Sequence, residues 1–159
     1  MRIELKGDLA MIKIMFVCHG NICRSPMAEF IFKKIVSERG GDFKIVSSAT
    51  SREEIGNSVY PPAARVLAEH GISCKGKLAV QFTVEDYNYY DYIICMETYN
   101  IRNLVRMIGS DTQGKLCRLL DFTDNPRDVV DPWYSRDFET AYNDIYEGCL
   151  ALYEHLSGE

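Results

Sequence analysis

"MFVCHGNICRSPMAEFIFKKIV", residues 15–36, passes from an apolar, strand-like run through a short turn into a helical pattern. The turn begins at Cys18 and ends in the pair Ser25-Pro26. Proline suits a first helical position and serine suits the cap before it, so the pattern predicts a helix that begins at Pro26 with Ser25 as its N-cap. Whatever the turn binds would therefore lie at a helix N-terminus, which carries partial positive charge.

Strand and helix patterns alternate along the rest of the chain. The predicted strands are 12–18, 43–49, 92–96 and 115–120. The predicted helices are 26–39, 61–70, 98–108 and 138–156. Four such units predict a single α/β domain, a four-stranded parallel sheet with helices on both faces in the flavodoxin-like, doubly wound arrangement. Ligands of such sheets bind at the carboxyl ends of the strands, and the Cys18 turn leaves the end of the first strand.

Composition narrows the class of protein and its partners. The 159 residues are 47% hydrophobic, which suits one domain with a real core, and the net charge of −5 offers no basic field for nucleic acid or an anionic membrane. No apolar run approaches the ~20 residues of a membrane span. The first ten residues lack the apolar core of a signal peptide, so we expect a cytoplasmic protein.

Two further expectations concern the N-terminus and the cysteines. Met11 is a possible alternative start, so residues 1–11 are expected to be a leader or extension and 12–159 the folded domain. Six cysteines at irregular spacing predict free thiols, not a disulfide framework.

The residue types in the turn suit the binding of a tetrahedral oxyanion. Gly20 and Asn21 tolerate left-handed backbone angles, which lets successive N–H groups converge on an anion. Arg24 offers a planar fork to two phosphate oxygens. The same positive field favours the thiolate of Cys18, and only a thiolate is a strong nucleophile at neutral pH. The turn therefore predicts a nucleophile beneath an oxyanion cradle.

The residues of the turn also have simpler explanations that involve no oxyanion site. A single cysteine at a strand end usually fills a core, and a Gly-Asn pair alone usually marks a turn. A zinc site made by Cys18, His19 and Cys23 fits poorly, because zinc prefers four ligands and no second Cys/His cluster of suitable spacing follows. We therefore expect no metal and no cofactor.

The turn "VCHGNICRSP" (17–26) carries the signature V-C-x-G-N-x-C-R-S-P, and here the chain resembles the low-molecular-weight protein tyrosine phosphatases. The likeness runs from about residue 12 to 156. It includes "SSATSREEIGN" (47–57), "EHGIS" (69–73), "DYIICM" (91–96) and "DPWY" (131–134). For this family the resemblance implies a four-stranded parallel sheet and metal-free hydrolysis of phosphotyrosine through a cysteinyl-phosphate intermediate.

The resemblance also implies roles for the residues of the turn. Cys18 matches the nucleophile, and Arg24 matches the residue that, with the loop amides, holds the phosphoryl oxygens. Asn21 matches a loop-stabilising residue, Ser25 a hydroxyl that donates to the thiolate, and Cys23 a second thiol beside the nucleophile. The remaining residues expected to form or support the phosphate site are His19, Gly20 and Ile22.

A phenolate leaving group has a pKa of ~10 and calls for a proton donor near neutral pH. Spacing alone does not choose among the four candidates, which are Asp121, Asp124, Asp128 and Asp131. The family motif D-P-aromatic chooses Asp131. By the same resemblance Trp133 and Tyr134 line the slot for the substrate ring, where an aromatic wall would stack on a phenyl group.

The chain also departs from the family pattern. Many members carry a histidine and an arginine in the stretch after "HGI", where Lys77 and Val80 stand here, so the loop-stabilising contacts of that histidine do not carry over. Animal members often show an aromatic residue where this chain has Glu53, which predicts a different substrate rim.

Two relatives on the same scaffold are alternative enzymes. Arsenate reductases use a further pair of cysteines on a mobile segment, which Cys74 and Cys95 do not resemble. Protein arginine phosphatases typically show threonine where this loop has Ile22. A phospho-binding module without catalysis is the alternative outside the enzymes. The expected partners are phosphotyrosine proteins or peptides, with inorganic phosphate and other oxyanions as inhibitors.

Overall fold

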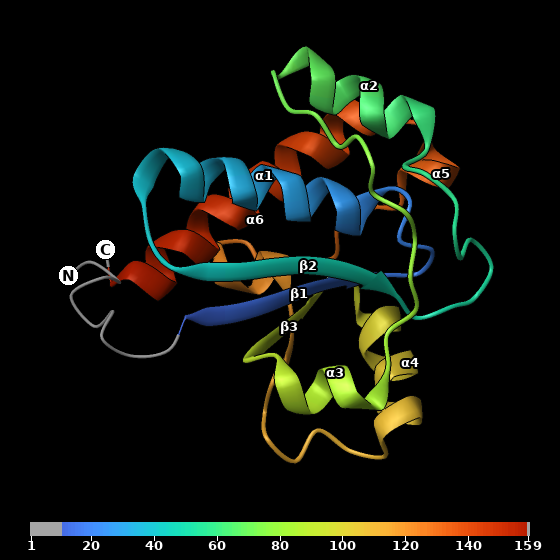
Figure 1. Ribbon diagram of the computed structural model, residues 1–159, viewed down its shortest axis with the longest axis vertical. Coiled ribbons are helices and arrows are strands. Elements are labelled where there is room, and N and C mark those ends of the chain that lie inside the picture. The colour runs from blue at the N-terminus through green and yellow to red at the C-terminus, as the bar shows by residue number, and fades with distance from the viewer. Residues whose placement is uncertain (1–10, 159) are drawn as a thin grey trace.

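A sheet of four parallel strands forms the centre of the molecule, which the structure, a computed structural model, describes for residues 11–158 (Figure 1). The strand order is β2-β1-β3-β4. The strands are β1 (Ile12–Cys18), β2 (Phe43–Ala49), β3 (Tyr92–Cys95) and β4 (Leu116–Arg118). The predicted four-stranded parallel sheet is confirmed.

Strand β1 lies between β2 and β3, and its side chains fill both halves of the core. Ile14 and Phe16 join the apolar cluster on one face of the sheet, and Met15 and Val17 join the cluster on the other. Successive side chains of a strand point to opposite faces, so a strand covered on both sides needs apolar residues at every position. This is why the run from Ile14 to Cys18 is continuously apolar, while Lys13 lies where the strand is only half-buried.

Helices cover both faces of the sheet, as predicted. On one face α1 (Arg24–Arg39) packs against β1, β2 and α6 (Phe138–Ser157), and α2 (Pro61–Glu69) lies outside them (Figure 1). On the other face lie α3 (Val84–Tyr89) and α4 (Thr98–Ile108). The apolar stripe of α6 faces the core, where Ile145, Cys149 and Leu152 are fully buried.

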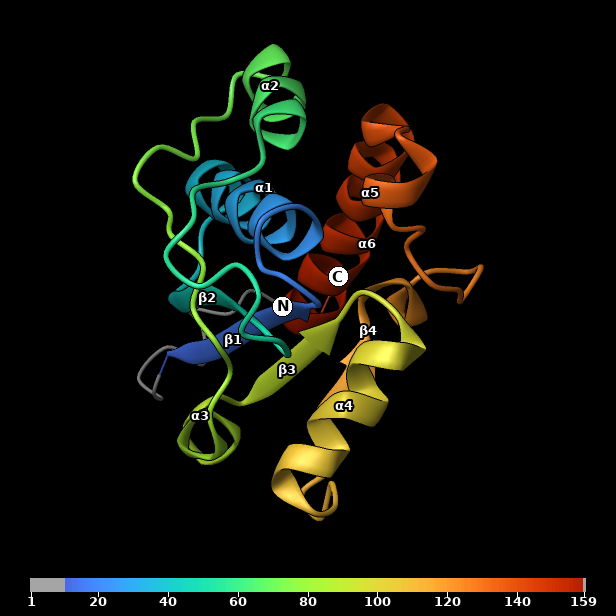
Figure 2. The same ribbon diagram turned by 90° about the vertical axis from the view of Figure 1, so that its right-hand side faces the viewer.

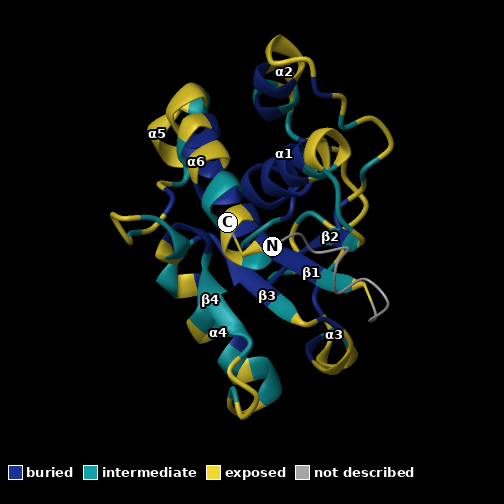
Figure 3. Cartoon of the chain, turned by 90° about the vertical axis from the view of Figure 1, so that its left-hand side faces the viewer, coloured by how far each residue is buried: buried dark blue, intermediate teal, exposed yellow. Residues whose placement is uncertain are grey.

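The carboxyl ends of the strands gather the features that build the site. Figure 2 looks onto this end of the molecule, where the loop from β1 to α1 and the short helix α5 (Pro132–Ser135) lie. Figure 3 shows that β1 and most of α1 are buried, so the loop between them starts and ends on a rigid core.

The start of α1 differs from its prediction. The helix begins at Arg24 and Cys23 occupies the N-cap position, without a side-chain capping bond. Ser25 lies inside the first turn, and its hydroxyl contacts the sulfur of Cys18 instead of capping the helix. Pro26 is tolerated there because the first N–H groups of a helix have no partner within the helix.

The fourth strand is shorter than predicted, and three short helices are present that the sequence patterns did not predict. The run at 115–120 divides into β4 and a 3-10 helix, η2 (Leu119–Phe122), because Asp121 accepts a hydrogen bond from the Arg118 amide at 2.9 Å and turns the chain. Helix α3 begins at a capping box formed by Thr83 and Asp86. Helix α5 begins at Asp131.

Smaller differences affect single residues at element ends. β3 ends at Cys95 and α2 at Glu69, each one residue before the predicted end, and α6 continues to Ser157. The predicted leader or extension, residues 1–11, lies outside the described residues except for Met11. Within residues 11–158 no helix is long and apolar enough to cross a membrane.

Candidate active site

The sulfur of Cys18 lies at the carboxyl end of β1, where three donors converge on it. The Ser25 hydroxyl is 3.0 Å away, and the backbone amides of Asn21 and Ser25 each lie at 3.4 Å. The residue is only 3% exposed. Donors that point at a sulfur stabilise its negative charge, so this environment suits a thiolate.

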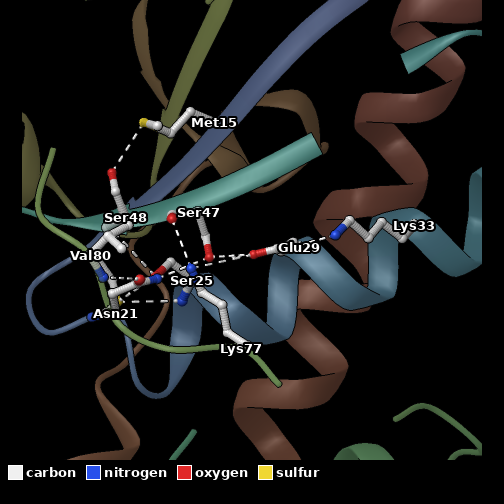
Figure 4. Close-up of polar contacts among 10 residues, drawn as sticks. Met15, Asn21, Ser25, Glu29, Lys33, Ser47, Ser48, Lys77 and Val80 are labelled. Atoms are coloured by element: carbon white, nitrogen blue, oxygen red, sulfur yellow. Dashed lines mark hydrogen bonds and ion pairs between the residues drawn. The ribbon is translucent and has the colours of Figure 1, made fainter. Parts of the chain in front are cut away.

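Asn21 holds the shape of the loop. Its φ of 60° lies in the left-handed region, which turns its amide toward the sulfur of Cys18. Its side-chain NH₂ group donates to the hydroxyls of Ser25 at 2.8 Å and Ser47 at 3.0 Å (Figure 4). Its side-chain oxygen, Oδ1, accepts a hydrogen bond from the Val80 backbone amide at 3.1 Å. Asn21 therefore ties the loop to β2 and to the segment around Val80.

Gly20 does not take the left-handed backbone conformation that the sequence suggested. It is not among the residues with positive φ. A Cβ at this position would lie 3.3 Å from Cγ of Glu54, tighter than an ordinary contact. The glycine therefore eases the close approach of the neighbouring loop, and only Asn21 of the pair takes the left-handed conformation.

Arg24 is 2% exposed and its guanidinium is held by three groups. One terminal nitrogen donates to the Val129 carbonyl at 2.8 Å. The other donates to Glu97 at 2.6 Å and lies 3.3 Å from the Asp131 carboxylate. Burial lowers the pKa of Arg24, but the negative charges of Cys18, Glu97 and Asp131 outweigh that effect and the net pKa is raised. The side chain is a fixed cation beside Cys18.

The structure separates the four candidate acids. Asp131 lines the same pocket as Cys18 and Arg24, while the other three aspartates do not. Asp121 and Asp128 form ion pairs with Arg118, and Asp128 also accepts a hydrogen bond from the Thr98 amide. Burial raises the pKa of Asp128, but the bonds from Arg118 and Thr98 lower it overall, so this carboxyl is a poor proton donor.

Asp131 is positioned by the start of α5. Its carboxylate accepts a hydrogen bond from the Trp133 amide at 3.0 Å, as an N-cap, and it is about one quarter exposed. An N-cap side chain is held in one orientation. The second carboxylate oxygen faces Arg24, so Asp131 stands beside the guanidinium in the same pocket as Cys18.

These groups meet in a cavity of about 230 Å³. Every predicted site residue except Asn21 and Ser25 lines this cavity. The side chains of those two residues are buried and form a hydrogen bond with each other. The lining residues are Cys18, His19, Gly20, Ile22, Cys23, Arg24, Glu53, Glu54, Asp131, Trp133 and Tyr134.

The pocket wall is aromatic and its rim is charged. The ring of Trp133 lies 4.8 Å from that of Tyr60, centroid to centroid, and Tyr134 is 82% exposed beside it. Across the mouth, Nε2 of His19 lies 3.2 Å from the Glu53 carboxylate. The departure at Glu53 noted in the sequence therefore places a polar contact between His19 and Glu53, not an aromatic ring, at this edge.

Cys23 is a second thiol in the pocket with a different environment. The pKa of Cys23 is raised to about 12, chiefly by burial and also by the negative charges of Cys18 and Asp131, while Arg24 and Arg136 lower it less. It therefore stays protonated at neutral pH. All six cysteines lie within the described residues and none forms a disulfide, as predicted.

Several residues of the site had no signal in the sequence that singled them out. Glu97 and Val129 fix Arg24 from positions 73 and 105 residues away, and Ser47 binds Asn21 across 26 residues. Glu97 lies two residues after the end of β3, at the carboxyl edge of the sheet, which is the one sequence feature that could have suggested it.

Comparison with known proteins gives one consistent result. The family model described as low molecular weight phosphotyrosine protein phosphatase matches residues 13–159. Over 153 residues the chain is 39% identical to the low molecular weight protein-tyrosine-phosphatase YfkJ of Bacillus subtilis, covering 94% of this chain and 98% of that protein. It is 40% identical to the low molecular weight phosphotyrosine protein phosphatase of Sus scrofa, covering 90% and 94%.

Solved structures agree. The crystal structure of YfkJ superposes with a TM-score of 0.87 at 38% identity, covering 91% of this chain and 93% of that one. Vibrio vulnificus Wzb in complex with benzylphosphonate superposes with a TM-score of 0.81 at 26% identity, covering 92% and 99%. With the family's fold, its signature loop and a match over nearly its whole length, the chain belongs to the low molecular weight phosphotyrosine protein phosphatase family, a family of phosphoric monoester hydrolases.

Proposed function

We propose that this enzyme hydrolyses phosphotyrosine in proteins through a phosphorylated Cys18, with Asp131 as the general acid. One observation carries the proposal. The Cys18 sulfur, held by two amides and a hydroxyl, opens onto the same small pocket as a buried Arg24 and a positioned Asp131.

In the first step the Cys18 thiolate attacks phosphorus. A sulfur–phosphorus bond forms, the bond from phosphorus to the tyrosine oxygen breaks, and Asp131 gives its proton to the departing oxygen. A phosphate dianion beside Asp131 favours the protonated carboxyl that this step needs. Arg24 and the loop amides stabilise the charge on the three phosphoryl oxygens.

In the second step a water molecule attacks the phosphocysteine. Asp131, now a carboxylate, takes a proton from the water, the sulfur–phosphorus bond breaks, and inorganic phosphate leaves with Cys18 again a thiolate. The guanidinium of Arg24 has five N–H donors, so its contacts with Glu97 and Val129 leave donors for the phosphate. Glu97 and Val129 thus orient Arg24 and leave some of its N–H donors for the substrate phosphate.

The aromatic wall supports an aryl phosphate as substrate. Trp133 and Tyr134 would flank the phenyl ring of a phosphotyrosine whose phosphate lies in the loop. Benzylphosphonate, bound in the Vibrio vulnificus structure, joins a phenyl ring to a phosphonate and so resembles this substrate. Inorganic phosphate and other tetrahedral oxyanions should compete for the same cradle.

The positions of the remaining cysteines speak against the arsenate reductase alternative. Cys95 is fully buried among side chains on one face of the sheet, and Cys74 packs against the core on the other face. Two thiols separated by a sheet do not form a relay. Ile22, the feature that distinguished the arginine phosphatases, lines the pocket as an apolar residue.

The experiment that tests the proposal compares substrates. Hydrolysis of para-nitrophenyl phosphate in the presence of EDTA would separate a metal-free enzyme from a binding module. Phosphotyrosine peptides, phosphoarginine peptides and arsenate with thiol reductants would then be compared by kcat/KM. We expect phosphotyrosine to be preferred, and a preference for phosphoarginine or reduction of arsenate would contradict the proposal.

The rim supplies a testable prediction about sequence preference. A carboxylate at Glu53 should repel peptides with acidic residues beside the phosphotyrosine, although its pairing with His19 softens the effect. Glu53→Gln should therefore raise kcat/KM for acidic-flanked peptides by about twofold to fivefold more than for basic-flanked ones, and the difference should shrink in high salt. Parallel changes for the two peptide sets at low ionic strength would show that Glu53 does not select substrates.

A second prediction concerns oxidation. Hydrogen peroxide should convert the Cys18 thiolate to a sulfenic acid with release of hydroxide, and the Cys23 thiol should then displace water from it to form a disulfide. Dithiothreitol reduces that disulfide. After peroxide treatment the wild-type enzyme should recover more activity with dithiothreitol than Cys23→Ser, whose Cys18 oxidises further. Equal recovery in the two proteins would remove the protective role of Cys23.

A further inference from the structure

The short helix α5 carries Trp133 and begins at Asp131, yet it has only four residues. A helix of this length is not stable by itself, so the position of α5 depends on the contacts at its two ends. Asp131 caps its first turn, and Arg136 lies at its other end, in the short connection to α6 (Figure 2). The contacts of Arg136 therefore bear on how firmly Asp131 is held.

Arg136 has a left-handed backbone. Its φ is 61° and its ψ is 15°, and its amide donates to the Pro132 carbonyl at 2.8 Å, which closes α5. This conformation favours glycine and is strained for a residue with a Cβ. Among the residues that the structure describes, Asn21 in the loop from β1 to α1 is the one other non-glycine residue with positive φ. Because such strain collects at functional sites, the side chain of Arg136 calls for an explanation.

The guanidinium of Arg136 connects α5 to Tyr60. One terminal nitrogen donates to the Trp133 carbonyl at 3.3 Å, and the other donates to the Tyr60 hydroxyl at 3.0 Å. The guanidinium carbon also lies 5.5 Å from the ring centroids of Tyr60 and Phe138. The two nitrogens of the planar fork hold their acceptors in fixed directions, which a flexible ammonium does not reproduce.

Tyr60 in turn is attached to the loop that would hold the phosphate. Its backbone amide donates to the Ile22 carbonyl at 2.8 Å, and its ring packs against the small apolar cluster that contains Ile22 and Cys23. The same ring lies 4.8 Å from that of Trp133, centroid to centroid. Tyr60 therefore contacts the loop through its backbone, α5 through its ring and Arg136 through its hydroxyl.

We propose that Arg136 is a positioning residue for Asp131, because it holds α5 against Tyr60 and so against the loop that carries Cys18. The proposal rests on the proposed function and deepens it, since it names what sets the position of the general acid. Arg136 is not among the residues that line the pocket. Its effect on the reaction therefore passes through α5.

The contacts of α5 matter most while the substrate reacts. Without substrate the Asp131 carboxylate also lies 3.3 Å from Arg24. In the reacting complex Asp131 is protonated and Arg24 binds the phosphate, so this ion pair no longer holds the acid. The carboxyl must still lie within hydrogen-bond reach of the departing oxygen. A loosened α5 should therefore slow substrates whose leaving group needs the proton, while phosphate binding is spared.

The test removes the side chain and keeps the backbone conformation. Arg136→Gly suits a left-handed residue, so its melting temperature should stay within a few degrees of wild type. It should lower the burst rate with phenyl phosphate, which has a poor leaving group, by roughly 10-fold, and that with para-nitrophenyl phosphate by less than about threefold. By calorimetry, inorganic phosphate should bind as in wild type. An equal loss for both substrates, no loss, or weaker phosphate binding would overturn the proposal.

Two variants separate the fork of Arg136 from its charge. Arg136→Lys keeps the positive charge without the fork, and it should lose at least about threefold with phenyl phosphate. A wild-type rate in this variant would show that the charge acts and the fork does not, against the proposal. Arg102→Ala is the control for the loss of one positive charge, because Arg102 is an exposed arginine of α4, on the other face of the sheet. It should match wild type in every measurement.

The route through Tyr60 has its own variant. Tyr60→Phe removes the hydroxyl that accepts from Arg136 and keeps the ring beside Trp133. It should slow phenyl phosphate more than para-nitrophenyl phosphate, and adding it to Arg136→Gly should change the rate by less than about twofold. Effects that simply multiply would show that Arg136 does not act through Tyr60. If Arg136→Gly fails to fold, Tyr60→Phe is judged by the same criteria.

Fluorescence reports on α5 without any turnover. Trp133 is the only tryptophan of the chain, so the emission comes from α5 alone. In Arg136→Gly the fluorescence anisotropy should decay faster on the nanosecond scale, because the ring moves with a loosened helix. In Arg102→Ala the decay should stay as in wild type. An unchanged decay in Arg136→Gly would show that Arg136 does not hold α5.

A comparison with Asp131→Asn separates a failure of this proposal from a failure of the proposed function. With Asp131→Asn already present, Arg136→Gly should change the burst rate by less than about twofold, because no acid remains to be positioned. If Asp131→Asn alone leaves the dependence on leaving group as in wild type, the proposed general acid fails and the role of Arg136 with it. If Asp131→Asn steepens that dependence and Arg136→Gly does not, only the role of Arg136 fails.

Discussion

Cys18→Ser is expected to abolish hydrolysis of para-nitrophenyl phosphate, with a loss of roughly 10⁴-fold or more, as for removal of other covalent nucleophiles. A serine hydroxyl is not ionised at neutral pH, and the hydrogen bonds of the Cys18 sulfur come from the Ser25 hydroxyl and two backbone amides, none of which is a base that would take its proton. The cradle nevertheless remains, because Arg24 is held by Val129 and Glu97, and Asn21 is tied to Ser47 and Val80. Cys18→Ser should therefore bind inorganic phosphate within a few fold of wild type.

Arg24→Ala is the matching variant, which should lose both catalytic turnover and the binding of inorganic phosphate. The guanidinium is the buried cation of the pocket, and without it the half-buried carboxylates of Glu97 and Asp131 face the bound anion uncompensated. Turnover and phosphate binding should both be lost, while Cys18→Ser loses only the first. Calorimetry with inorganic phosphate and a steady-state assay on the same preparations decide this. Substantial turnover by Cys18→Ser would exclude the covalent mechanism.

The central strands were predictable because a parallel sheet leaves a clear pattern in the sequence. β1 is buried on both faces from Ile14 to Cys18, so its apolar run is continuous over these residues. The same rule misled at 115–120, because Leu119 and Leu120 are apolar for a different reason: they bury their side chains in η2 against α6. An apolar pair in sequence does not tell a strand from a short helix.

In the loop from β1 to α1, the local sequence preference for a helix cap does not predict the observed structure. The Ser-Pro pair predicts a helix cap, but the serine hydroxyl is committed to Cys18 and the helix begins before it without a capping bond. Places where a sequence breaks its own local preference are often functional sites. The contacts of Arg24 with Glu97 and of Lys77 with Ser47 join residues 73 and 30 positions apart, and no local pattern encodes such pairs.

The choice of Asp131 as general acid gives the second large prediction. Asp131→Asn should lower the rate of Cys18 phosphorylation by about 10²- to 10⁴-fold for aryl phosphates with poor leaving groups, because those need a proton most. Para-nitrophenyl phosphate, with an activated leaving group, should suffer much less. The rate should be measured by stopped flow as the first burst of phenol release, so that hydrolysis of the phosphocysteine does not mask it.

The structure makes asparagine a clean replacement at this position. Asparagine caps a helix about as well as aspartate, so the bond to the Trp133 amide and the start of α5 should persist. The loss of one negative charge beside Arg24 should leave phosphate binding unchanged or slightly tighter. A fall in rate with undiminished phosphate affinity would therefore report lost proton transfer and not a damaged pocket.

Asp128→Asn provides the control within the same segment. Asp128 is bound to Arg118 and Thr98 outside the pocket, so its replacement should cost some stability but leave the dependence on leaving group as in wild type. For Asp131→Asn that dependence should become much steeper, because the phenolate then leaves without a proton. If instead Asp131→Asn lowers the rate equally across the leaving-group series, the acid is another aspartate of the segment, and Asp124→Asn becomes the variant to measure.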